Sequence, residues 1–278
     1  QFDASGNLIG SIDGGQLITL EGCTSISDTN GNLLFYTDGT LVYNRNHQLM
    51  PNGTGLFGDS SSTQSALVVP LPGSDTIYYI FTSDIGAEDG LDFGFNYSIV
   101  DMTLDGGLGD ITSKNINLLQ ESSEKITAVL KDCASESIWV IVLSNVNDTL
   151  PLPGEPASSD TYYAYEVTTT GINTIPVKST FTTQIRDARG QMKVSPNGKK
   201  LISANMNGGL HLYDFDTSTG IVSNQQTLTI TSFPSFFAYG VEFSQNSLRL
   251  YVHSHNGQGA NAEANLHRSQ LTHFDLSD

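Results

Sequence analysis

Residues 194–202 read VSPNGKKLI: a short strand that ends at Ser195, a turn, and an apolar strand that begins at Leu201. The same order recurs at residues 26–36 (ISDTNGNLLFY) and 243–251 (FSQNSLRLY), and looser copies begin at residues 67 and 128. Asn and Gly in the turns favour a β-hairpin because both residues tolerate positive φ angles. The chain therefore repeats one hairpin five times.

A third apolar segment with an aromatic or acidic signature follows each hairpin. These segments are Val42–Tyr43, Tyr97–Asp101, Tyr163–Val167, Leu212–Asp216 and Leu271–Asp275. Helical periodicity is nearly absent, because even the best candidate, residues 117–131, places its apolar side chains irregularly. The pattern predicts an all-β chain.

The five copies are separated by 41, 61, 66 and 49 residues. Propeller blades span about 40–50 residues, and longer spacings are explained by loop insertions. A single four-stranded blade cannot bury its own faces, so blades stack around an axis. We therefore predict one β-propeller domain over residues 1–278, with four-stranded antiparallel blades. A β-sandwich is the alternative. Either Phe2–Leu20 closes the ring, or the chain is a fragment of a longer multidomain protein.

The charge distribution excludes several partners. The chain carries 12 Lys and Arg against 29 Asp and Glu, a net charge of −17, and residues 1–113 hold one cation, Arg45. Nucleic acids bind clustered cations, and anionic membranes repel acidic surfaces, so we expect neither as a partner. No segment has the length of a membrane span. The polar, acidic composition suits an extracellular protein.

Several blocks of residues carry a resemblance to a known family. They are EGCTSISD (21–28), GNLLFYTDG (31–39), VYNRNH (42–47), MPNG (50–53), SSTQSALVVP (61–70), YYIFT (78–82), YSIVDM (97–102), EKITAV (124–129) and YGVEFS (239–244). In this order they resemble the N-terminal propeller region of large secreted Bacteroidetes proteins of the gliding-motility group. That group carries a C-terminal sorting domain that the type IX secretion machinery recognises.

The resemblance implies a location at the cell surface and export by type IX secretion. The chain lacks the sorting domain, and nothing after Phe274 matches a further block that family members usually have. The biochemistry of the family is largely undefined, so the resemblance implies an architecture and a location more readily than a ligand.

Candidate metal ligands occur at two places. Asp28, Asn30 and Asn32 alternate around a glycine as in a calcium loop, although a carboxylate at the twelfth position is missing. The same residues are ordinary hairpin turn formers. His253 and His255 share one face of a predicted strand and could bind zinc together with a carboxylate. We expect no cofactor, with calcium as the alternative, and we favour ordinary structural roles for the residues at both places.

Two further features concern covalent chemistry. Cys23 and Cys133 could form a disulfide in an exported protein, or could be two buried thiols. Thr76 and Thr149 follow aspartates in sequences that resemble the short Bacteroidetes O-glycosylation sequon. Both threonines lie in predicted loops.

No catalytic constellation is evident. Residues 60–64 are polar but lack a nucleophile elbow, and the many carboxylates give no basis for selecting a glycosidase pair. Glu21, Asp38, Arg45 and Glu242 lie in the family blocks near strand ends. We expect Arg45 to form a structural ion pair inside the ring, and a role in orienting a ligand is the alternative. Each Tyr-Tyr pair should send one ring into a core and the other outward.

The sequence favours a non-enzymatic, adhesin-like module of the cell surface. Such a module would bind a protein or glycan ligand through a rigid ring and its loops. One alternative is a glycan hydrolase or lyase, because propellers host both roles. A second alternative is a structural subunit of an extracellular assembly.

Overall fold

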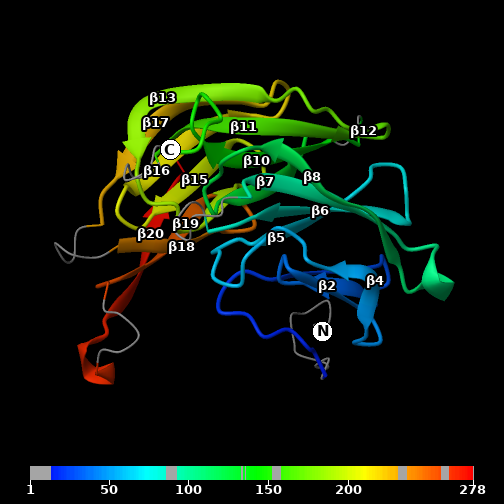
Figure 1. Ribbon diagram of the computed structural model, residues 1–278. Helices are drawn as coiled ribbons and strands as arrows, with labels where there is room; N and C mark the ends of the chain where they lie inside the picture. Colours follow the sequence, from blue (N-terminus) through cyan, green and yellow to red (C-terminus); the bar gives the residue numbers. More distant parts are fainter. Residues whose placement is uncertain are drawn as a thin grey trace.

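The computed structural model describes residues 14–85, 93–132, 134, 136–151, 158–230, 237–257 and 263–277. The regular secondary structure of this part of the chain is β-strand, apart from two 3-10 turns at residues 105–107 and 264–266. The strands form five antiparallel sheets, which follow one another in chain order (Figure 1). The predicted all-β fold is confirmed.

The strands of each sheet are consecutive in sequence. The first sheet contains β1 (Thr24–Ser27), β2 (Leu33–Thr37), β3 (Leu41–Asn44) and β4 (Leu49–Thr54). The second contains β5 (Ala66–Pro70), β6 (Ile77–Ser83), β7 (Phe95–Asp101) and β8 (Asp110–Leu119). The third contains β9 (Ile126–Leu130), β10 (Ile138–Ser144), β11 (Ser159–Thr168), β12 (Gly171–Ile172) and β13 (Val177–Ile185). The fourth contains β14 (Met192–Val194), β15 (Lys200–Asn205), β16 (Gly209–Asp216) and β17 (Ile221–Leu228). The fifth contains β18 (Phe237–Phe243), β19 (Arg249–His255) and β20 (Ser269–Asp275).

The five predicted repeats correspond to these five sheets. The first strands of neighbouring sheets contact one another in the order β1, β5, β9, β14 and β18. Four hydrophobic cores separate the five sheets, one between each sheet and the next. The sheets are thus stacked face to face around their first strands, which is the arrangement of propeller blades and not of a two-sheet sandwich.

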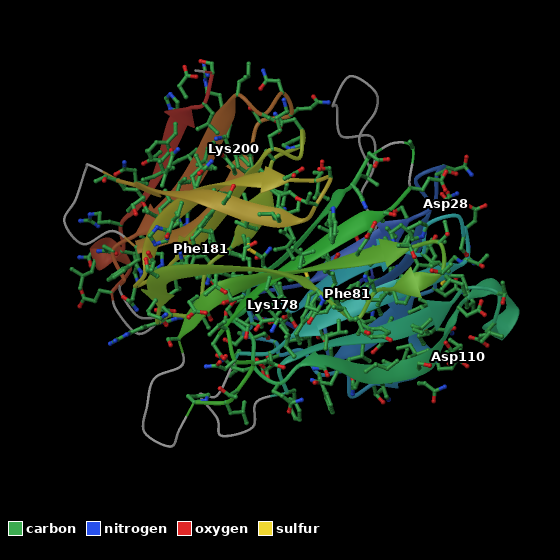
Figure 2. All side chains as sticks on the ribbon, turned by 90° about the horizontal axis from the view of Figure 1, so that it is seen from above. Asp28, Phe81, Asp110, Lys178, Phe181 and Lys200 are labelled. Atoms are coloured by element: carbon green, nitrogen blue, oxygen red, sulfur yellow. The ribbon has the colours of Figure 1, made fainter. Side chains whose placement is uncertain are left out.

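Neighbouring tyrosines fill two different cores. Tyr78 packs between the first and second sheets, whereas Tyr79 packs between the second and third. Tyr162 and Tyr163 divide in the same way between the two faces of the third sheet. The expectation that one ring of each pair points outward is wrong, because a stacked sheet has a core on both faces. Phe81 lies in the same core as Tyr79. Figure 2 shows Phe81 toward the middle of the molecule and Asp110 at its edge.

The described residues do not show how a ring would close. The fifth sheet has three strands within these residues, and residues 14–20 form no strand. The Leu20 amide donates to the Ser60 carbonyl at 3.0 Å, and the Gln16 amide donates to the Tyr36 hydroxyl at 3.1 Å. Residues 16–20 therefore bind to the first sheet and to the loop before the second, rather than to β20. Residues 1–13 lie outside the described part.

Candidate functional site

A pocket of about 890 Å³ lies where the first strands of the sheets meet. Its walls come from residues 20–24 before and in β1, from residues 63, 64, 66 and 67 at β5, from residues 189, 191 and 193 at β14, from Met206, and from Tyr239 and His255 of the fifth sheet. Most of the side chains that line it are polar. Within the described residues, this pocket joins four of the five sheets, and we call it the central pocket.

The fold delivers polar side chains to this place in a regular way. Glu21, Thr63, Glu124 and Arg189 each lie two or three residues before the first strand of a sheet. The chain therefore enters four successive sheets from the same end, and the residues at these entry points face one another. Tyr239 belongs to β18 and brings the fifth sheet to the same point.

A chain of hydrogen bonds joins two carboxyl groups across the floor of the central pocket. The hydroxyl oxygen of Thr63 lies 2.6 Å from Glu124 Oε2 and 2.9 Å from the hydroxyl oxygen of Tyr239. The hydroxyl oxygen of Tyr239 lies 2.6 Å from Glu21 Oε2. Glu21 is exposed in the pocket, whereas Glu124 is buried behind Thr63. We call these four side chains the carboxyl relay.

Burial changes the acidity of the groups at the inner end of the carboxyl relay. Desolvation raises the pKa of Glu124 to about 7, although hydrogen bonds from Thr63 and the charge of Lys125 oppose the shift. Burial also raises the pKa of the Tyr239 hydroxyl, and the nearby carboxylate of Glu21 adds to this effect. Glu124 can therefore exchange a proton near neutral pH, whereas Tyr239 stays protonated there.

A buried lysine holds the loop beside the carboxyl relay. The ammonium group of Lys125 donates to the backbone carbonyls of Asp187, Ala188 and Arg189, at 3.5 Å for Asp187 and 2.8 Å for Arg189. Burial lowers the pKa of Lys125 to about 7, and the neighbouring carboxylates of Glu124 and Asp187 oppose that shift. All three donors of the ammonium group have acceptors, so Lys125 connects the third sheet to the loop before the fourth.

That loop presents Arg189 to the central pocket. The Arg189 guanidinium donates twice to the carboxylate of Asp187, at 2.9 and 2.8 Å. Burial alone would raise the pKa of Asp187, but the hydrogen bonds and charge of Arg189 outweigh it and lower that pKa. A bidentate pair fixes the guanidinium plane of Arg189 at the wall of the central pocket.

Gln64 ties three sheets together at the same level. Its side-chain oxygen accepts hydrogen bonds from the amides of Met192 at 2.8 Å and Ile126 at 3.4 Å. Its amide nitrogen donates to the Met192 carbonyl at 3.3 Å. The second, third and fourth sheets are thereby held in register around the central pocket.

The structure places the predicted calcium residues in a turn. The Asp28 carboxylate accepts hydrogen bonds from the amides of Asn30 and Asn32 and from the Asn32 side chain. Those hydrogen bonds lower the pKa of Asp28. The geometry is that of a hairpin turn, which agrees with the favoured interpretation, and calcium binding stays a prediction.

The predicted zinc residues do lie on one face of β19. The rings of His253 and His255 are 6.2 Å apart between centroids. Among the described residues, no three His, Cys, Asp or Glu side chains gather into a group that could hold a metal ion. His255 instead lines the central pocket and contacts the Tyr239 ring edge to face.

The predicted structural ion pair of Arg45 is wrong. The Arg45 guanidinium donates to the Gly107 carbonyl, and Asp38 accepts hydrogen bonds from the amides of Thr40 and Leu41. Glu242 pairs with Lys193 at 3.3 Å, and Glu21 belongs to the carboxyl relay. These residues lie near strand ends as expected, but Asp38 precedes β3 and Arg45 follows it, so the two lie at opposite ends of that strand, and Glu242 belongs to the fifth sheet.

The remaining predicted residues lie at the surface or outside the described part. Thr76 is half-buried in the turn between β5 and β6, and Thr149 is exposed in the loop after β10, so both are in loops as predicted. Cys23 lies at the central pocket. Cys133 lies outside the described residues, so the predicted disulfide stays a prediction.

Sequence reasoning missed Thr63, Glu124, Lys125, Arg189 and Tyr239 as a site. Four of the five lie within blocks that carry the family resemblance, and all five lie just before or within the first strand of a repeat. The position before each repeat was the signal that could have found them. Local sequence patterns could not indicate the hydrogen bond between Thr63 and Tyr239, because these residues are 176 positions apart in the chain.

Comparison with known proteins adds information on the fold. Neither a protein-family model nor a curated protein matches the sequence. Hydrazine synthase of Kuenenia stuttgartiensis superposes with a TM-score of 0.50 at 12% identity, covering 96% of this chain and 66% of that one. Exo-β-1,3-galactanase of Phanerochaete chrysosporium gives a TM-score of 0.49 at 10% identity, over 99% of this chain and 63% of the other. The chain thus spans less than two thirds of both proteins, and the likeness concerns the fold alone.

A periplasmic gluconolactonase of Pseudomonas aeruginosa gives a TM-score of 0.44 at 10% identity, over 92% of this chain and 68% of that chain.

In the part of the chain that the structure describes, we find no helix with the length and apolar character needed to cross a membrane.

Proposed function

We propose that the central pocket binds a glycan and cleaves it by acid–base chemistry. The observation that carries this proposal is the carboxyl relay, which links an exposed carboxyl group, Glu21, to a buried one, Glu124. Glycan cleavage needs groups that donate and accept protons near neutral pH. A buried carboxyl group whose pKa is raised to about 7 meets that requirement.

The pocket also suits a saccharide in size and chemistry. A volume of about 890 Å³ is in the range of small-ligand sites. Arg189, Gln191 and Tyr239 offer hydrogen-bonding groups to sugar hydroxyls, and Leu20 and Met206 offer apolar surface to the sugar ring. We assign proton exchange with the substrate to Glu21, because it is the acidic side chain that lines the central pocket.

Binding without cleavage is the second candidate, and it corresponds to the function that the sequence favoured. The buried position of Glu124 supports it, because Glu124 is 3% exposed and does not line the pocket. A glycosidase commonly has two carboxyl groups that both flank the scissile bond. Here only one of the two can touch a ligand directly.

One experiment separates the two candidates. The protein is incubated with a panel of polysaccharides, β-1,3-galactan among them, and products are identified by mass spectrometry. Cleavage that Glu21→Gln reduces by at least about 100-fold, with binding retained, supports the enzyme. The control Glu136→Gln, an exposed carboxylate outside the central pocket, should leave the rate unchanged. Saturable binding without any product would favour the binding module and reject cleavage.

We also propose that the protein acts outside the cell after export by type IX secretion. The support is the family resemblance and the acidic composition. Immunodetection in the culture medium and on intact cells of the source bacterium tests this, and detection in the cytoplasmic fraction alone would contradict it.

A further inference from the structure

The carboxyl relay contains more hydrogen-bonding contacts than hydroxyl protons. Three oxygen–oxygen contacts, at 2.6, 2.9 and 2.6 Å, run from Glu124 through Thr63 and Tyr239 to Glu21. Each contact at such a distance needs one proton between its two oxygens. Thr63 and Tyr239 supply one proton each, and an ionised carboxylate supplies none.

The missing proton has a definite consequence. If both carboxyl groups were ionised, Thr63 would donate to Glu124 and Tyr239 would donate to Glu21. The two hydroxyl oxygens would then face each other at 2.9 Å with only lone pairs between them. The Thr63 oxygen already accepts a hydrogen bond from the Gly190 amide at 3.3 Å, and that bond does not remove the repulsion between the two hydroxyl oxygens. One added proton on either carboxyl group completes all three hydrogen bonds.

We propose that Glu21 and Glu124 share one proton through the hydroxyl groups of Thr63 and Tyr239. With the proton on Glu124, this carboxyl group donates to Thr63, Thr63 donates to Tyr239, and Tyr239 donates to the Glu21 carboxylate. With the proton on Glu21, all three hydrogen bonds reverse, and Thr63 donates to the Glu124 carboxylate. The two arrangements have the same number of protons and the same net charge.

This sharing gives the central pocket a proton reservoir. With the shared proton on Glu124, the O–H bonds along the relay break and re-form in sequence, so that Glu21 gains the proton and Glu124 becomes ionised. Glu21 can then donate this proton to a bound substrate group, which leaves both carboxyl groups ionised. When Glu21 next takes a proton from water, the reverse sequence passes it to Glu124 and restores the shared proton. The use of this proton in glycan cleavage rests on the proposed function, but the sharing is a property of the free protein.

The charged groups around the carboxyl relay do not strongly favour the shared proton on either Glu21 or Glu124. Lys125 lies beside Glu124 and stabilises its ionised form, whereas burial and the charge of Glu21 disfavour it. Lys125 in turn faces Asp187 and Arg189 from the loop before the fourth sheet. At the other end, the His255 ring lies 5.9 Å from the Tyr239 ring between centroids. Burial lowers the pKa of His255, and the charges of His253 and Arg189 add to this, so that imidazole is neutral at the pH of the exchange.

Carboxyl ¹³C NMR on protein labelled at glutamate tests the proposal without any glycan. In the wild-type protein we expect the signals of Glu21 and Glu124 to move together in one pH step near neutrality. Tyr239→Phe and Thr63→Val each remove one hydroxyl and should abolish that step at Glu21 while leaving a step at Glu124. Tyr43→Phe, a tyrosine of β3, is the matched control and should change neither signal.

A neutral step confined to Glu124 in the wild-type protein would overturn the proposal, and this measurement needs no variant. A step that persists at Glu21 in both Tyr239→Phe and Thr63→Val would also overturn it. Coupled titration in a protein that cleaves no polysaccharide would reject the proposed function alone. Cleavage that depends on Glu21, without coupled titration, would reject the shared proton alone.

Discussion

Lys125 donates a hydrogen bond of 2.8 Å from its ammonium group to the backbone carbonyl of Arg189. The contact joins residues at the entries to two neighbouring sheets and places a fully buried amino group next to the buried carboxyl group of Glu124. The floor of the central pocket is therefore held by ionisable groups rather than by an apolar core. These ionisable groups affect the stability of the fold and the dependence of that stability on pH.

Lys125→Met should destabilise the protein by about 2–4 kcal/mol, because the carbonyl groups of Asp187 and Ala188 lose their donor, although the Arg189 carbonyl keeps a hydrogen bond from another backbone amide. Urea unfolding measures the change. Lys199→Met, at an exposed turn, is the control, and it should change the unfolding free energy by less than about 0.5 kcal/mol. Equal stability of both variants would show that the carbonyl groups of residues 187–189 do not depend on Lys125.

Glu124→Gln should weaken the pH dependence of stability. The folded pKa of Glu124 is raised to about 7 from an ordinary value of 4.5, so folding favours the protonated form. Its contribution is complete below about pH 4.5 and is lost as the pH rises toward 7, at most about 1.4 kcal/mol per pH unit. Urea unfolding from pH 4.5 to 7.5 should show a smaller loss in Glu124→Gln than in the wild type. Parallel curves for the two proteins would contradict the raised pKa.

Gly220→Ala should destabilise the interface between the third and fourth sheets by about 2 kcal/mol. Gly220 has a φ of 78°, and an added Cβ would lie 2.8 Å from the Trp139 ring. The same ring donates a hydrogen bond of 2.7 Å to the Thr217 carbonyl. In a Trp139→Leu background only the backbone strain should remain, about 1 kcal/mol. A double-mutant cycle measured by urea unfolding checks this, and identical costs in both backgrounds would exclude the steric clash.

Gln64→Met should lower the unfolding free energy by about 2–3 kcal/mol, because two buried backbone amides lose the oxygen that accepts from them. The control Gln48→Met changes an exposed side chain of the same type and should have little effect. Hydrogen exchange should locate the loss at Ile126 and Met192. Unchanged protection at those two amides would show that other groups satisfy them.

The sequence predicted the arrangement of strands well because the turn chemistry is local. Asn197 and Gly198 form the turn that the motif VSPNGKKLI predicts, and β14 and β15 flank it. The number of sheets followed from counting copies of this motif. By contrast, Tyr78 and Tyr79 did not predict that the second sheet has a core on both faces. Neighbouring side chains of a strand point to opposite faces, but this alternation does not say what covers each face.

The site could not be predicted from local patterns. Glu124 and Lys125 are adjacent charged residues before a strand, which ordinarily indicates an exposed loop. They are buried because the chain enters several sheets at one point, and that convergence is a property of the whole arrangement. The expected ion pair of Arg45 failed for the same reason, because proximity in sequence to a strand end does not state which other strand ends lie nearby.

The most direct test of the central claim is a crystal structure of Glu21→Gln with a bound oligosaccharide from the polysaccharide panel. We expect a sugar in the central pocket, with one of its oxygens within about 3 Å of the substituted side chain at position 21 and another contacting Arg189 or Tyr239. A sugar bound elsewhere on the protein, with the central pocket filled only by water, would contradict glycan binding at the central pocket.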